Sequence, residues 1–359
     1  MGTWLGIAFT ICFLTGLWSH LQQTTPGWLT LPVDPAWLYR VTQGVHVIAG
    51  TAAVPLLLVK LWSVYPRLFL RPPRGTGALA LHALERLSIL ALVAAAIFQL
   101  ASGLTNIVQW YPWAFSFRAT HYAVAWIAIG ALLLHLAVKW PAIRAAYARE
   151  GGTTVPLGSS ESAEDARTRR SVLVAAGVAA GLAVVLTAGQ TVPWLRRVSV
   201  LAVRSGDGPQ GLPVNRTAAQ AGVARPTGWQ LEVVHGDTRR TFTLDDLTAL
   251  PQTTRVLPIA CVEGWSRSAE WTGVPVRTLL AMVGAPASSE VHVSSLQTRR
   301  AFGTSDLPPA FAADPRTLLA LRLNGEELDL DHGWPCRLIA PNRPGVRQTK
   351  WVTRLEVRT

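Results

Sequence analysis

The stretch IACVEGWS, residues 259–266, contains the residue that says most about this chain, Cys261. Further along, the sequence reads DHGWPCR at residues 331–337 and PGVRQTKW at residues 344–351. A soft thiolate suits a redox metal, whereas a phosphate is bound by cationic side chains and backbone donors. The order of these residue types therefore indicates a metal ligand followed by an anion-binding segment.

Together the three strings resemble the molybdenum-cofactor domain of the sulfite oxidase superfamily. The resemblance implies that Cys261 supplies a thiolate to molybdenum and that the two later strings hold the pterin and its phosphate. The residues that it assigns to the pterin are His332, Arg337, Arg343, Gly345, Arg347, Gln348, Thr349 and Lys350. The residues beside the cysteine that line the approach of a substrate are Glu263, Trp265, Ser266 and Arg267.

The chain departs from the family's pattern directly after the cysteine. An arginine-rich string that occurs in sulfite-oxidising members is replaced by EGWSR, residues 263–267, in which Arg267 is the one arginine. This departure weakens the expectation that sulfite is the substrate. Taken without its neighbours, Cys261 has a second interpretation as a small buried hydrophobic residue, which is the usual role of a free cysteine.

The sequence around these strings predicts a mixed fold that is rich in strands. Alternating apolar and β-branched residues predict strands, and short runs with a cap or a closing glycine predict helices. The expected strands are 229–234, 241–244, 255–260, 290–295, 317–323, 336–341 and 351–358, and the expected helices are 245–251 and 276–283. We expect Asp245 or Thr243 to cap the first helix and an Asn324-Gly325 turn to follow the fifth strand.

The composition of the first half indicates a membrane domain. Half of the 359 residues are apolar and 15% are charged, which is low for a soluble protein. Apolar runs of spanning length occur at about 4–20, 41–63, 81–104, 120–140 and 171–190. The net charge of +12 is spread along both halves rather than clustered, and we therefore expect no nucleic-acid partner.

The charges of the loops predict how the spans are oriented. Eleven basic residues fall on one side of the predicted spans, against Arg40 and Arg118 on the other. Cytoplasmic loops carry the excess of Lys and Arg. We therefore expect a multi-pass protein of the cell membrane with a cytoplasmic N-terminus and an extracytoplasmic C-terminal domain.

Histidines at matching depths predict haem in the membrane domain. His121 and His135 share one span, and fourteen residues place them about 21 Å apart on nearly the same face. The expected pairs are His46 with His121 and His82 with His135, an arrangement that resembles membrane b-type cytochromes and implies two haems. His20 is the rival outer ligand, and the alternative is that these are interfacial histidines without haem.

The segment between the halves predicts the domain boundaries. Residues 150–168 have the composition of a linker, and TRRSVLV at residues 168–174 resembles a twin-arginine export signal, although Arg169 and Arg170 also fit a role in topology alone. The expected domains are a four-helix cytochrome b-like bundle at 1–149, the linker and fifth span at 150–195, and the molybdopterin-binding domain at 196–359.

The expected function is a membrane-bound oxidoreductase with molybdopterin and b-type haem. It would exchange electrons between the quinone pool and a small substrate, with reduction of an S-oxide or N-oxide favoured. The alternatives are a sulfite-type dehydrogenase that runs in the opposite direction, and a non-catalytic electron-transfer or binding module that holds no molybdenum.

Overall fold

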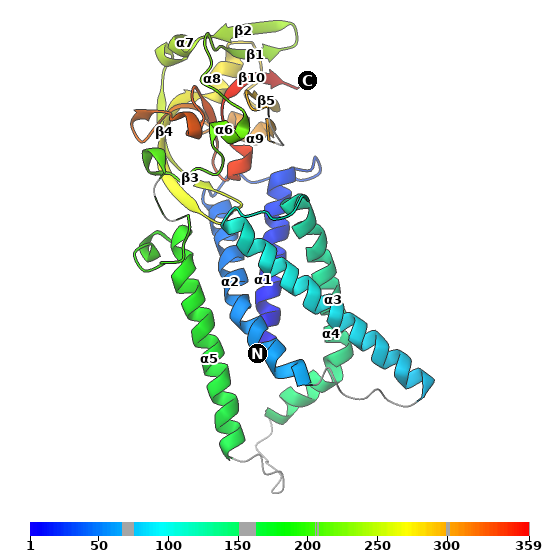
Figure 1. The fold of residues 1–359 in the computed structure, drawn as a ribbon. Coiled ribbons are helices and arrows are strands. Elements are labelled where there is room, and N and C mark those ends of the chain that lie inside the picture. The colour runs from blue at the N-terminus through cyan, green and yellow to red at the C-terminus, as the bar shows by residue number, and fades with distance from the viewer. Residues whose placement is uncertain (67–74, 151–162, 205, 207, 299–301, 359) are drawn as a thin grey trace. The chain divides into compact units, whose positions relative to one another are not determined.

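Five long helices precede a domain of short strands in the computed structural model (Figure 1). The structure describes the chain except residues 67–74, 151–162, 205, 207, 299–301 and 359. The long helices are α1 Gly2–Thr24, α2 Leu38–Val64, α3 Thr76–Ile107, α4 Phe117–Glu150 and α5 Ala163–Thr187. The twin-arginine-like string lies in α5, whereas most of the predicted linker lies outside the described residues.

Each of these five helices is long and apolar enough to cross a membrane. Their apolar windows are largely unburied within the protein, as expected for helices whose outer faces contact lipid. The prediction of five apolar helices followed by a strand-rich domain is confirmed.

The chain divides into two compact units. The first comprises residues 1–17, 45–188 and 198–201, and the second comprises 18–44, 189–197 and 202–359. The second unit therefore includes the end of α1, the connection to α2 and the first turns of α2.

Two five-stranded sheets make up most of the second unit. One has the order β2-β1-β10-β5-β6, and the other has the order β3-β4-β7-β8 with β9 also paired to β7. The strands are β1 Leu231–His235, β2 Thr238–Phe242, β3 Thr253–Ala260, β4 Ser266–Pro275, β5 Val291–Ser295, β6 Thr304–Leu307, β7 Leu318–Leu323, β8 Glu326–Glu327, β9 Arg337–Ile339 and β10 Val352–Val357. The short helices are α6 Ala218–Ala221, α7 Leu244–Ala249, α8 Val276–Ala281 and α9 Pro309–Ala313.

Apolar side chains from both sheets share one core. A single cluster contains Leu231 of β1, Val293 of β5 and Leu355 of β10, together with Leu319 of β7 and Leu338 of β9. Burial of this apolar surface is the main term that holds the sheets together. A second cluster contains Ile259 of β3, Trp271 of β4 and Leu323 of β7. Cys261 belongs to this cluster as well.

Local signals in the sequence are found where they were expected, with small shifts of boundary. Thr243 rather than Asp245 caps α7, in a reciprocal capping box with Asp246. The turn at Asn324 and Gly325 joins β7 to β8, with φ of 50° and 84° at the two residues. These values fit the turn type that Asn-Gly favours in a two-residue hairpin.

Gly273 provides a test of how closely β4 and β7 approach. A Cβ atom at this position would lie 2.1 Å from the carbonyl oxygen of Leu319 and 2.6 Å from Cα of Ala320. We expect Gly273→Ala to destabilise the strand-rich unit by at least about 2 kcal/mol, because the backbone atoms it meets cannot rotate away. Thermal unfolding of the detergent-purified protein measures this loss. Gly273→Ala with unchanged unfolding would contradict the packing.

Candidate functional site

Cys261 begins the tight loop that joins β3 to β4. The backbone N–H of Cys261 donates to the carbonyl of Trp265 at 2.9 Å, and the N–H of Gly264 donates to the carbonyl of Cys261 at 3.0 Å. Gly264 has φ of 91°, a conformation that glycine adopts without strain. The loop therefore holds Cys261 at the end of a strand, as the sequence predicted, with 1% of its surface exposed.

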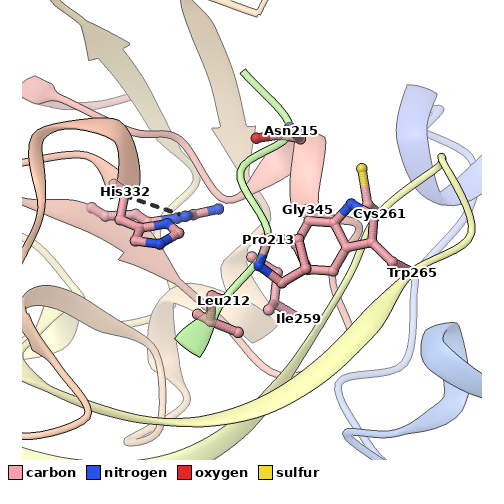
Figure 2. Close-up of a pocket in the computed structure, with 9 residues that line it drawn as sticks. Leu212, Pro213, Asn215, Ile259, Cys261, Trp265, His332 and Gly345 are labelled. Carbon is pink, nitrogen blue, oxygen red and sulfur yellow. Dashed lines mark hydrogen bonds between the residues drawn. The ribbon is translucent and has the colours of Figure 1, made fainter. Parts of the chain in front are cut away.

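A pocket beside Cys261 is lined by residues from all three sequence strings, 259–266, 331–337 and 344–351. Figure 2 shows the side chains that line it, drawn from the Cys261 loop, the later strings and a segment that precedes them. Its lining residues are Leu212, Pro213, Asn215, Ile259, Cys261, Trp265, His332, Arg337 and Gly345. The first, second and third strings thus each contribute to one cavity.

Gly345 allows the third string to approach the first. Ala260 and Pro344 form an isolated parallel bridge, and a Cβ atom at Gly345 would lie 3.1 Å from the carbonyl oxygen of Ala260. A larger residue would push these two segments apart. The glycine therefore permits a close backbone approach to the strand that leads into Cys261.

His332 is neutral and fixed in one tautomer. Its Nε2 lies 2.7 Å from the carbonyl oxygen of Pro209, so this nitrogen carries the proton and donates it. Burial, and then the charge of Arg337, lower the pKa of His332 to about 4. The residue therefore acts as a hydrogen-bonding group at neutral pH rather than as a cation.

Arg337 and Lys350 are buried cations beside the pocket. Burial lowers the pKa of Arg337 to about 10, and burial together with Arg337 lowers the pKa of Lys350 well below its usual value. Lys350 Nζ donates to the carbonyls of Arg216 and Asp331 at 2.9 and 2.7 Å, and Arg337 Nη1 donates to the carbonyl of His332 at 3.3 Å. Nε of Arg337 has no partner.

A second group of polar residues lies around Arg343. Arg343 Nη2 donates to the carbonyl of Asp306 at 2.8 Å, while its buried Nη1 has no partner. Gln348 Nε2 donates to the carbonyl of Arg343 at 3.0 Å, and the hydroxyl of Thr349 lies 2.6 Å from that of Ser305. Burial, with Arg347 next, lowers the pKa of Arg343 to about 9.

The cationic residues lack the negative partners that buried charges require. Within the described part of the chain, Arg337, Arg343, Arg347 and Lys350 form no ion pair with a carboxylate. A buried charge without a partner is costly, and a bound anion removes that cost. The residues therefore fit a phosphorylated cofactor with a thiolate-bound metal at Cys261.

Cys261 itself is held as a thiol until a metal displaces its proton. Burial, and then the carboxylate of Glu263, raise the pKa of the Cys261 thiol well above its ordinary value. A metal ligand must be deprotonated, so a metal bound here would displace this proton, and its binding would become stronger as the pH rises. Lys350 and Arg204 act in the opposite direction and favour the thiolate.

The other candidates beside Cys261 are buried and engaged with neighbours. Trp265 Nε1 donates to Glu263 Oε2 at 3.1 Å, the Ser266 hydroxyl donates to the carbonyl of Thr191 at 3.4 Å, and Arg267 Nη1 donates to the carbonyl of Gln190 at 3.4 Å. Trp265 lines the pocket. Ser266 and Arg267 are instead directed at the chain segment that follows α5.

Several residues near Cys261 were not identified from the sequence. Arg204 Nε lies 4.0 Å from Glu263 Oε2, and Leu212, Pro213 and Asn215 form part of the pocket wall. They lie between the fifth helix and the first strand, where no periodic pattern or motif marks them. The positive charge of Arg204 was the one signal in the sequence. A positive charge alone does not distinguish a functional-site residue from an ordinary surface residue.

In the helical unit, His46 and His121 face one another. Their ring centres are 6.3 Å apart. Two imidazoles that bind one metal ion at about 2 Å from each nitrogen have their ring centres about 6 Å apart. His46 Nδ1 lies 2.9 Å from the carbonyl of Cys12, and His121 Nδ1 lies 2.9 Å from the hydroxyl of Ser102. Such bonds orient a metal-binding histidine and leave Nε2 for the metal.

Glycines border both of these rings. A Cβ atom at Gly16 would lie 3.0 Å from Cε1 of His46, and one at Gly103 would lie 3.8 Å from Cε1 of His121. A larger side chain at Gly16 would crowd the ring of His46. The residues of this pair therefore fit a haem iron held between them.

The second pair of histidines is arranged differently. Arg86 Nε donates to His82 Nε2 at 3.4 Å, and Glu85 in the same helix is paired with Lys139 of α4. His135 lies within electrostatic range of Lys139, Lys60 and Glu85. No ring contact joins His82 to His135 among the residues that the structure describes.

Comparisons with known proteins find one family and several relatives that match parts of the chain. Residues 218–359, less than half of the chain, match the family described as the oxidoreductase molybdopterin binding domain. The chain is 35% identical to a putative protein-methionine-sulfoxide reductase subunit YedZ1 of Azospira oryzae over 33% of this chain and 44% of that protein. It is 33% identical to the mitochondrial sulfite oxidase of Drosophila melanogaster over 38% of this chain and 28% of that protein.

A third relative is the protein-methionine-sulfoxide reductase catalytic subunit MsrP of Ralstonia nicotianae. It is 32% identical over 38% of this chain and 46% of that protein. The chain thus spans less than half the length of each of these three relatives. The predicted resemblance to the sulfite oxidase superfamily is confirmed for the strand-rich region, and with it the prediction of a molybdopterin-binding oxidoreductase domain.

Replacing Arg337 tests whether the buried charge serves a bound anion. We expect Arg337→Met to lower the molybdenum content of the purified protein severalfold while raising the melting temperature of its cofactor-free form, because an unpaired buried charge is removed. Arg322→Met is the matched control, since Arg322 is an exposed arginine of β7 that bonds the carbonyl of Gly325. Full molybdenum content in Arg337→Met would contradict the assignment.

Proposed function

Because residues 218–359 form a molybdopterin-binding oxidoreductase domain, we propose that the chain is a membrane-bound oxidoreductase that exchanges electrons between the quinone pool and a small substrate. One observation carries the proposal. The buried Cys261 thiol shares a pocket with Arg337, a buried cation that lacks an anionic partner. Cys261 would bind the metal, and His332, Arg337 and Lys350 would hold the pterin and its phosphate.

We favour reduction of an S-oxide or N-oxide as the reaction. Two of the relatives are named for protein-methionine-sulfoxide reduction, and one is named for sulfite oxidation. The bound molybdenum cofactor supplies two-electron oxygen-atom transfer. Reduction of a sulfoxide consumes two electrons and two protons and releases water.

The protein's own part in this reaction is to shape the approach of the substrate. Glu263 is the carboxylate of the Cys261 loop, and it accepts a hydrogen bond from the indole N–H of Trp265 at 3.1 Å. We propose that its negative charge beside Cys261 helps to select the substrate. Trp265 would shield the pocket from water, since it is buried and lines the cavity.

Haem in the helical unit would carry the electrons. The facing rings of His46 and His121, 6.3 Å apart, support one haem between them. A second haem between His82 and His135 rests on the matching depth of these residues in the sequence, and His82 Nε2 would have to leave Arg86 to bind iron. The excess of basic loop residues on one side supports a cytoplasmic N-terminus and an extracytoplasmic molybdopterin domain.

A sulfite-type dehydrogenase that passes electrons inward is the second candidate. The same residues would serve it, and the mitochondrial sulfite oxidases among the relatives support it. Turnover with reduced quinone and methionine sulfoxide, against turnover with sulfite and oxidised quinone, separates the two directions.

Removal of the thiol tests the metal centre. We expect Cys261→Ser to reduce molybdenum-dependent turnover by at least about a thousandfold, because a hydroxyl is a poor ligand for this soft site. Elemental analysis of the detergent-purified protein should give about one molybdenum per wild-type chain. A wild-type protein with no molybdenum would instead support a non-catalytic electron-transfer or binding module.

Replacement of the outer histidines tests the haem. We expect His46→Ala and His121→Ala each to remove one haem per chain, as measured from the b-type bands of a reduced-minus-oxidised spectrum. His20→Ala is the control, because His20 is the rival outer ligand and should leave the haem content unchanged. Loss of haem in His20→Ala but not in His46→Ala would make His20, rather than His46, the outer haem ligand. A wild-type spectrum without b-type bands would reject haem altogether.

A further inference from the structure

The loop that carries Cys261 is held by residues that lie outside the molybdopterin-binding domain. Val262 and Gly264 both belong to this loop, and each has a carbonyl that accepts a side-chain hydrogen bond from a distant segment. The donors are Gln43, at the start of α2, and Thr191, which follows α5. Both donors belong to the same compact unit as the loop.

Gln43 is fixed at both ends of its amide. Its Nε2 donates to the carbonyl of Val262 at 3.3 Å, and its Oε1 accepts from the hydroxyl of Ser19 at 3.1 Å. Ser19 in turn accepts from Gln23 Nε2 at 3.0 Å and lies 3.1 Å from the hydroxyl of Tyr39. Gln43, Ser19 and Gln23 are all buried. The amide is therefore placed by a buried polar network, which makes it a rigid support.

Thr191 contacts the other side of the same loop. Its hydroxyl donates to the carbonyl of Gly264, and its backbone carbonyl accepts from the hydroxyl of Ser266 at 3.4 Å. The residue is 8% exposed. A Cβ atom at Gly44 would lie 2.5 Å from Cγ2 of Thr191, so the glycine next to Gln43 leaves the space that Thr191 occupies.

We propose that Gln43 and Thr191 are positioning residues for Cys261 and that they set the orientation of its sulfur. Within the loop, two backbone bonds join Cys261 to Gly264 and Trp265, and the indole of Trp265 bonds Glu263; Gln43 and Thr191 add bonds from outside it. Without Gln43 and Thr191, the carbonyls of Val262 and Gly264 lose these donors in a buried region, and the loop moves to satisfy them. The proposal rests on the proposed function in taking Cys261 as the molybdenum ligand.

The rate at which the Cys261 thiol is alkylated in the cofactor-free protein measures how often the loop opens. We expect Gln43→Leu and Thr191→Val to speed alkylation of Cys261 by iodoacetamide by about fivefold, the factor that one net hydrogen bond contributes to closing a local opening. Peptide mass spectrometry separates this signal from that of Cys336, a second buried thiol bonded to the carbonyl of Val352 at 3.4 Å. The labelling of Cys336 should stay unchanged.

Two control variants separate the hydrogen bonds from general damage. Thr42→Val changes the residue next to Gln43. The hydroxyl of Thr42 donates to the carbonyls of Leu38 and Tyr39 within its own helix. Thr191→Ser keeps the donor to Gly264. Both controls should label at the wild-type rate. Equal labelling of Cys261 in Thr191→Val, Gln43→Leu and the wild type would overturn the proposal.

The loaded full-length protein gives a second measure. We expect Gln43→Leu and Thr191→Val to retain molybdenum but to alter the electron paramagnetic resonance signal of the Mo(V) state and to lower kcat more than they change KM. Unaltered spectra and kcat in both variants would reject the positioning role. If Cys261→Ser also left the molybdenum signal unaltered, the proposed function itself would fail, and the two failures are thereby distinguished.

Discussion

Buried positive charge that forms no ion pair, among the residues that the structure describes, is the constraint on which the strand-rich unit depends. Arg337, Arg343 and Lys350 are all less than 10% exposed, and their pKa values are lowered chiefly by burial. Backbone carbonyls satisfy part of their hydrogen-bonding capacity, and carboxylates act on Arg343 and Lys350 only from beyond ion-pair distance. A bound anion would lower the cost of burying these charges.

The sheets bring the thiol to this charge by a small number of backbone contacts. β3 ends at Ala260, next to Cys261, and its bridge to Pro344 places the third string of the sequence against the first. β9 begins at Arg337 and pairs with β7, which also pairs with β4. The pocket thus takes Ile259 from β3 and Arg337 from β9, while its other lining residues lie in loops and short helical turns.

The connection between the apolar helices α1 and α2 is part of the same compact unit. Asn342 bonds the backbone N–H of Tyr39 at 2.8 Å and the carbonyl of Pro32 at 2.6 Å, and Arg316 forms an ion pair with Asp34. Asn342, which follows β9 closely in the sequence, thereby holds the loop between α1 and α2. The domain that binds the cofactor and the loop between two apolar helices are consequently one packed structure, although three hundred residues separate them in the chain.

The sequence by itself determined the five apolar helices, the strand-rich domain, the place of Cys261 at the end of a strand and the residue types of an anion site. These follow from periodicity, capping and short motifs, which are properties of neighbouring residues. Only the tertiary structure decided that Arg343 belongs to a separate group from Arg337, that Ser266 and Arg267 face residues 190 and 191, and that Arg204 and Gln43 lie near the Cys261 loop. Such contacts join residues far apart in the chain, and no local pattern encodes them because packing alone selects them.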